Sequence, residues 1–142
     1  MTTTSALVGR AVELDQFNDL LTGIEDQGRA VLVHGDPGIG KSSLLHAVAS
    51  AARARGMTVL ETTGVESESG MPYAGLHRLL MPLLGGTERL PETQRRALFT
   101  AIGIEDGPAP QIFLVALAAL TLLTERAEAR PVVAVIDDIQ WL

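Results

Sequence analysis

Eight residues, Gly35 to Ser42, constrain the fold of this 142-residue chain more than any other feature. Their sequence, GDPGIGKS, fits the pattern G-x-x-x-x-G-K-[ST] in full. Glycines let a backbone turn so that successive N–H groups point at one anion, and a helix that starts there adds its positive N-terminal end. The pattern therefore predicts a phosphate-binding loop between a strand and a helix.

The residue types in this loop each have an expected role. Lys41 is the only lysine among 11 lysine and arginine residues, and its compact ammonium suits the β and γ phosphates better than the planar fork of arginine. Ser42 offers a hydroxyl to Mg²⁺, and we expect Lys41 to be catalytic as well. The predicted nucleotide contacts in the loop are Gly35, Asp36, Pro37, Gly38, Ile39, Gly40, Lys41, Ser42 and Ser43. The alternative is a chance match in a glycine-rich chain, against which the strand and helix on either side argue.

Hydrophobic periodicity predicts the elements around the loop. An apolar run at 30–34, which we expect to be a strand buried on both faces, precedes the loop, and a helix over 41–55 and a strand over 57–61 follow it. Strand, helix and strand form a βαβ unit, which builds a parallel sheet. The other predicted elements are helices over 11–27, 74–84, 92–102 and 110–128 and a strand over 132–136. The helix over 110–128 is apolar nearly all round, so we expect it to be buried.

Two carboxylates follow the last predicted strand directly. Asp137 and Asp138 stand at its C-terminal end, where ligands of open α/β sheets bind. We expect Asp137 to bind Mg²⁺ together with Ser42, and Asp138 to orient or polarise an attacking water. The alternative is that the two aspartates only begin a turn, as aspartate often does.

Composition and charge exclude several other classes of function. The net charge of −6 argues against contact with nucleic acid or an anionic membrane, and the absence of cysteine excludes disulfides and thiolate zinc sites. The start of the chain lacks the pattern of a secretory signal. The longest apolar run, Ile112 to Leu123, is shorter than the roughly 20 residues that a membrane-spanning helix needs. We therefore expect a cytoplasmic protein with a single aliphatic core.

Five segments, in order, carry a resemblance to a known family. They are LVGR at 7–10 with Glu13, GDPGIGKSSLL, GMPYAGLHRLLMPLL at 70–84, LPETQRRALFTAIG at 90–103 and RPVVAVIDDIQWL at 130–142. Together they resemble the STAND-class, AAA-type ATPase domain of large ATP-binding LuxR-type transcriptional regulators. The resemblance implies a P-loop NTPase fold, three-layer α/β/α with a parallel sheet, and ATP and Mg²⁺ as cofactors. It also places Val8, Gly9 and Arg10 near the adenine.

The same resemblance implies a nucleotide switch that hydrolyses ATP slowly and controls transcription. Relatives continue past the acidic (Walker B) strand, so we expect residues 1–142 to be a partial ATPase domain without the C-terminal helix-turn-helix that contacts DNA. The next strand would lie between 30–34 and 132–136, and without it we expect a poorly folded or aggregation-prone chain. Self-association through the ATPase domain is a further expectation. The alternatives are a P-loop small-molecule kinase and an inactive remnant.

Overall fold

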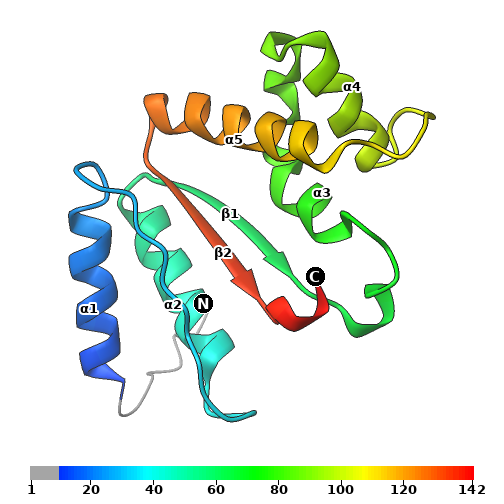
Figure 1. Ribbon diagram of the computed structural model, residues 1–142. Helices are drawn as coiled ribbons and strands as arrows, with labels where there is room; N and C mark the ends of the chain where they lie inside the picture. The colour runs from blue at the N-terminus through cyan, green and yellow to red at the C-terminus, as the bar shows by residue number, and fades with distance from the viewer. Residues whose placement is uncertain (1–9) are drawn as a thin grey trace, which may run out of the picture. The chain divides into compact units, whose positions relative to one another are not determined.

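The computed structural model describes residues 10–142, which fall into two compact units divided after Met57, 10–57 and 58–142. The first unit contains helices α1 (Ala11–Thr22) and α2 (Lys41–Ala54), which pack on each other (Figure 1). Their apolar faces bury Leu21 of α1 and Leu44, Val48, Ala49 and Ala52 of α2. The predicted helix over 41–55 is confirmed, and it starts directly at the end of the glycine loop.

Helix α1 is shorter than the predicted 11–27. It ends at Thr22, and the N–H of Gly23 donates to the carbonyl of Asp19 at 3.1 Å as the last helical bond. Glycine costs about 1 kcal/mol relative to alanine inside a helix. Gly23 therefore stops the helix before the predicted end at residue 27.

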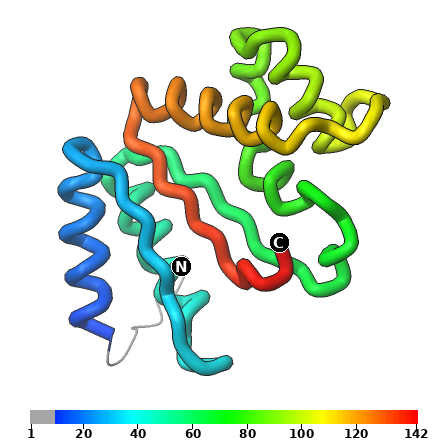
Figure 2. The backbone as a smooth tube through the Cα atoms, in the orientation of Figure 1, coloured from blue at the N-terminus to red at the C-terminus, as the bar shows by residue number. Residues whose placement is uncertain are grey.

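The predicted strand over 30–34 is wrong. These residues follow an extended path between α1 and α2 (Figure 2), but they have no ladder partner among residues 10–142. Val31 is 53% exposed and Leu32 is 77% exposed, so the expected burial on both faces is also wrong. An apolar, β-branched run becomes a strand only where a neighbouring strand takes up its N–H and C=O groups. The apolar composition of 30–34 does not determine whether such a neighbouring strand is present.

The second unit is built on a two-stranded parallel sheet. Strand β1 (Thr58–Thr63) pairs with β2 (Val132–Asp137) in a register that runs from Thr58 opposite Val132 to Thr63 opposite Asp137. Both strands were predicted within two residues, and so was the parallel sheet. The βαβ unit with 30–34 is wrong, because the partner of β1 comes from 74 residues further along the chain, as the register shows (132 − 58 = 74).

Three helices and the segments between them lie between the two strands in sequence. Helix α3 (Ala74–Leu80) passes into a 3-10 helix (Met81–Arg89), and α4 (Glu92–Ala101) and α5 (Ile112–Ala129) follow. Two further 3-10 turns span Glu66–Glu68 and Ile139–Trp141. The predicted helix over 74–84 changes type near Pro82, because proline has no N–H to donate to the carbonyl of Arg78. The other two helices agree with prediction within two residues.

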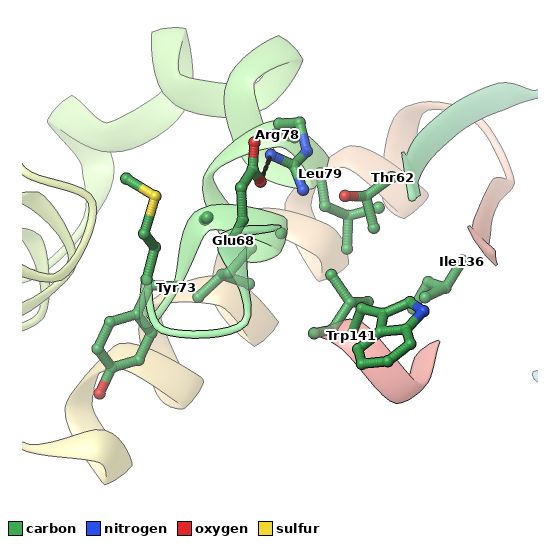
Figure 3. A pocket seen from close by; sticks show the side chains of 12 residues that line it. Thr62, Glu68, Tyr73, Arg78, Leu79, Ile136 and Trp141 are labelled. Atoms are coloured by element: carbon green, nitrogen blue, oxygen red, sulfur yellow. Dashed lines mark hydrogen bonds and ion pairs between the residues drawn. The ribbon is translucent and has the colours of Figure 1, made fainter. Parts of the chain in front are cut away.

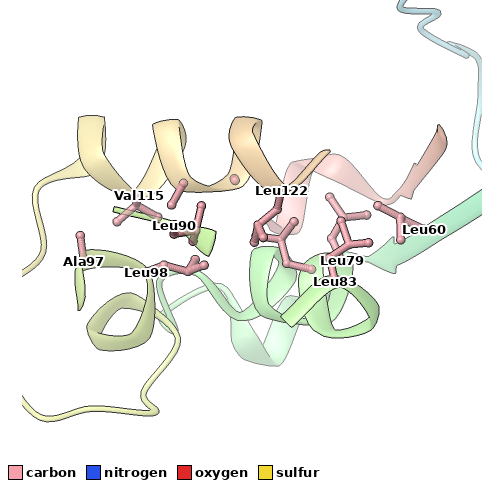
Figure 4. Close-up of a cluster of buried hydrophobic side chains, with 11 residues drawn as sticks. Leu60, Leu79, Leu83, Leu90, Ala97, Leu98, Val115 and Leu122 are labelled. Atoms are coloured by element: carbon pink, nitrogen blue, oxygen red, sulfur yellow. The ribbon is translucent and has the colours of Figure 1, made fainter. Parts of the chain in front are cut away.

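The core of this unit lies between β1 and the helices (Figure 4). Its largest fully buried side chains are Leu60, Leu80, Leu98 and Val115. Only one face of α5 enters this core, through Val115, Ala118, Ala119 and Leu122. Ile112, Phe113 and Leu120 are 74%, 73% and 59% exposed, so the expected burial of the whole helix is wrong. The helix packs mainly on α4, and within residues 10–142 nothing covers its other face.

The α/β class predicted from the sequence is confirmed. The sheet is parallel, and its C-terminal edge carries the two aspartates. Across residues 10–142, no helix combines the length and the apolar character that crossing a bilayer requires.

Candidate functional site

The glycine loop turns sharply into α2. Gly38 and Gly40 have φ of 81° and 91°, in the left-handed region that favours glycine, and Gly40 is the N-terminal cap of α2. No side chain caps this helix end, and the first intrahelical bond runs from the N–H of Leu44 to the carbonyl of Gly40 at 3.0 Å. The earlier N–H groups of the first turn therefore have no intrahelical acceptor. Together with the helix dipole they form an end suited to an anion.

Lys41 lies over the loop that precedes it. Its ammonium donates to the carbonyls of Gly35 at 2.9 Å and Asp36 at 3.0 Å. These two carbonyls hold the only lysine of the chain at the mouth of the loop, half-buried. Ser42 and Ser43 are exposed on the first turn of α2, so their hydroxyls can reach a ligand.

The side chain of Arg10 also holds the glycine loop, through a backbone carbonyl. Its Nη2 donates to the carbonyl of Ile39 at 2.8 Å, and its Nη1 pairs with the carboxylate of Glu13 at 2.7 Å. The predicted contact residue Arg10 thus reaches the backbone of the loop itself. Val8 and Gly9, predicted beside it, lie outside the described residues. Glu13 was not among the predicted site residues, although its position three residues after an arginine on a helix favours such a pair.

The pair between Arg10 and Glu13 has a pH dependence that can be measured. The hydrogen bond from Arg10, with a smaller contribution from the backbone, lowers the pKa of Glu13 below its ordinary value of 4.5. The contribution of the pair to folding is therefore complete above pH 4.5 and is lost as the pH falls through the lowered pKa. In an NMR titration of the Glu13 carboxyl, we expect a midpoint below 4.5 that moves back toward 4.5 in Arg10→Gln. Arg29→Gln is the matched control and should leave the Glu13 midpoint unchanged. A wild-type midpoint at or above 4.5 would contradict the pairing of Arg10 with Glu13.

The acidic turn is the second part of the candidate site. Asp137 ends β2 half-buried, and Asp138 follows it exposed, in a left-handed conformation with φ 48° and ψ 46°. Asp138 donates its N–H to Oδ1 of Asp137 at 3.0 Å, and Nε2 of Gln140 donates to Oδ1 of Asp138 at 3.2 Å. Each carboxylate thus accepts one local hydrogen bond and keeps oxygen lone pairs for a further partner.

The oxygen donors of both parts have the chemistry that Mg²⁺ prefers. No group of three or more His, Cys, Asp or Glu side chains gathers at metal-binding distance within residues 10–142. Mg²⁺ typically takes one or two carboxylates with water and substrate phosphates rather than an all-protein cage. Asp137 in the second unit and the hydroxyl of Ser42 in the first each offer an oxygen of this kind.

A small cavity adjoins the acidic turn, and the sequence did not predict it. Its volume is about 250 Å³, and Thr62, Tyr73, Leu79, Ile136 and Trp141 are among its lining residues (Figure 3). The ion pair between Arg78 and Glu68 also borders it, and Arg78 donates to the carbonyl of Thr63 at 2.9 Å. The hydroxyl of Thr62 is buried and has no hydrogen-bond partner among the described residues. Trp141 lines this cavity together with Ile136 of β2.

Gly64, which directly follows β1, is a further residue that the sequence did not predict for the site. Its N–H donates to the carbonyl of Asp137 at 2.9 Å, and its Cα lies against the carbonyl of Asp138. A glycine directly after a strand is the sequence signal that could have identified it, because such positions often mark a close backbone approach.

Comparison with known proteins agrees with the motifs. Residues 6–142 match the family described as the AAA ATPase domain, which is nearly the whole chain. No curated protein and no solved structure matches it. Members of an ATPase family use a nucleotide, typically with Mg²⁺. The phosphate loop, the acidic strand end and the extent of this match together assign the chain to the AAA ATPase domain family.

Proposed function

We propose that this chain binds ATP with Mg²⁺ through residues 35–43. The observation that carries the proposal is the glycine loop ending in the uncapped N-terminus of α2, with the ammonium of Lys41 held at its mouth. Backbone N–H groups and the helix dipole would bind the β phosphate, while Lys41 would leave its two carbonyl partners to pair with the β and γ phosphates. Arg10 keeps the loop in shape through the carbonyl of Ile39.

Ser42 and Asp137 are the proposed ligands of the metal. A bound Mg²⁺ supplies charge neutralisation and orientation of the phosphates. Asp138, exposed and carrying free lone pairs, is the proposed group that orients the attacking water and accepts its proton. We propose ATP hydrolysis as an activity of the complete protein. Asp138 and Lys41 are its catalytic residues.

The finer biological role follows from the resemblance of the five sequence segments. We propose that nucleotide binding acts as the switch of a LuxR-type transcriptional regulator in the cytoplasm. DNA would then be contacted by a separate helix-turn-helix domain rather than by this acidic segment. Self-association through the ATPase domain is part of the same proposal.

The metal dependence of ATP binding tests this function. A fluorescent ATP analogue is titrated into the wild type and into Asp137→Asn, each with Mg²⁺ and with a chelator. We expect Mg²⁺ to raise the affinity of the wild type, and we expect Asp137→Asn to lose about tenfold or more of that gain, since even the loss of a group that only supports a metal ligand typically costs about that much. The affinity without metal should stay the same, because the loop is intact.

Asp106→Asn is the matched control, since it removes an exposed carboxylate from the loop before α5. It should behave as the wild type does. Equal metal dependence in all three proteins would contradict the role of Asp137. Transfer of phosphate to a metabolite rather than to water would favour a kinase.

A further inference from the structure

Gly64 contacts the backbone of the acidic turn, Asp137 and Asp138, directly. It is buried at the end of β1, and its N–H extends the β1–β2 ladder by one bond, to the carbonyl of Asp137 at 2.9 Å. The next carbonyl, that of Asp138, lies directly over the place where a side chain would start at Gly64. The backbone of Asp138 therefore packs directly on the backbone of Gly64, with no side chain between them.

A Cβ at Gly64 would overlap the carbonyl oxygen of Asp138. It would also lie 3.0 Å from Cβ of Trp141 and 3.1 Å from the carbonyl carbon of Asp138. Because two of these three atoms belong to the backbone, a side-chain rotation cannot remove the clash. The backbone at Gly64 is outside the left-handed region, so alanine would meet no torsional strain there. The need for glycine at this position is purely steric.

The carbonyl of Asp138 is held on a second side as well. It accepts the N–H of Trp141 at 3.0 Å, which closes the 3-10 turn Ile139–Trp141. Asp138 itself is in the left-handed conformation, which aspartate adopts more readily than most other non-glycine residues. Contact with Gly64 and the bond from Trp141 together set the peptide plane after Asp138. They thereby fix the backbone from which its side chain starts.

We propose that Gly64 is a positioning residue for the carboxylates of Asp137 and Asp138. This inference rests on the proposed function, in which those carboxylates serve the metal and the water. A side chain at position 64 would displace the turn while leaving the phosphate loop, which lies in the other unit, unchanged. The expected signature is a loss of metal dependence without a loss of metal-free ATP binding.

Gly64→Ala and Gly70→Ala form a matched pair that tests this. Gly70 lies six residues further on, also outside the left-handed region, and a Cβ there would have no neighbour within 4 Å. Two readouts are measured for both variants and the wild type: the gain in ATP affinity on adding Mg²⁺, and the fluorescence of Trp141, the only tryptophan. We expect Gly64→Ala to lose about tenfold or more of the Mg²⁺-dependent gain, as for a group displaced by about 1 Å. Its emission maximum should shift, and Gly70→Ala should match the wild type in both.

The outcomes separate this inference from the proposed function. Unchanged emission and unchanged metal dependence in Gly64→Ala would overturn the positioning role. A wild type that binds no ATP would contradict the proposed function and with it the role toward the metal. If Gly64→Ala does not fold, hydrogen exchange of the Gly64 amide in the wild type tests the positioning role instead. The N–H of Gly64 should then exchange slowly, as a bonded ladder group does, and fast exchange would overturn the inference.

Discussion

Replacing Lys41 with alanine is expected to lower the affinity for ATP about 100-fold, which corresponds to about 2.7 kcal/mol of lost hydrogen bonds from a charged group. The loss is expected to be large because, within residues 10–142, no other cation near the loop can replace the ammonium. No other lysine exists in the chain, and the Arg10 guanidinium is already engaged with Ile39 and Glu13. With the ammonium gone, the loop keeps only uncharged donors for the phosphates, namely its backbone N–H groups and the hydroxyls of Ser42 and Ser43. Titration with a fluorescent ATP analogue measures the change.

Two further variants show whether the effect belongs to the ammonium. Lys41→Arg keeps the charge but replaces a compact donor with a planar fork, and we expect about a tenfold loss. Arg29→Ala removes an exposed positive charge from the same unit and should leave the affinity unchanged. Equal affinity of the wild type and Lys41→Ala would contradict nucleotide binding through this loop.

Replacing Leu98 with alanine is expected to lower the free energy of unfolding by about 2 to 5 kcal/mol, the usual range for a fully buried leucine. Leu98 has no exposed surface and belongs to the same buried cluster as Leu90, Ala97 and Val115 (Figure 4). Its truncation leaves a cavity between α4 and α5 that these neighbours fill only in part. Chemical denaturation followed by circular dichroism measures the loss.

Leu120→Ala is the control for Leu98→Ala, because it removes the same atoms from the exposed face of α5. Its effect should stay within about 0.5 kcal/mol. A large loss in Leu120→Ala, or none in Leu98→Ala, would contradict the placement of the core on one side of α5.

The sequence predicted the parts of the site that depend on short-range chemistry. Gly38 and Gly40 adopt the left-handed turns that the motif requires, and α2 starts at Lys41 as expected. Asp137 and Asp138 stand at the end of a parallel strand, also as expected. Such features are encoded within a few residues, so a single sequence contains them in full.

Features that depend on a distant neighbour could not be predicted in the same way. The run 30–34 has the composition of a strand, but whether it becomes one depends on a partner, and no described residue is that partner. Up to Leu123 the helix α5 is apolar nearly all round, yet only the side that meets α4 and the sheet is buried. Contacts of this kind lie far apart in sequence, and periodicity records only which side chains are apolar.

Gly64 and the hydrogen bond from Arg10 to the carbonyl of Ile39 illustrate a third limit. Position 64 needs glycine because the carbonyl of Asp138, which lies 74 residues later (138 − 64 = 74), occupies the space of a side chain. Arg10 holds the carbonyl of Ile39 rather than standing free for a ligand. Both roles arise from backbone atoms, which are the same for every residue type and leave no mark on composition.

Binding of ATP at the glycine loop is tested most directly by NMR on the ¹⁵N-labelled chain. ATP with Mg²⁺ is added stepwise, and AMP, which lacks the β and γ phosphates, is the control ligand. The expected result is saturable binding of one ATP, with the largest amide shifts at Gly38, Gly40 and Lys41 and only small shifts with AMP. Amides of the loop that stay unchanged at millimolar ATP, or equal shifts with AMP, would contradict it.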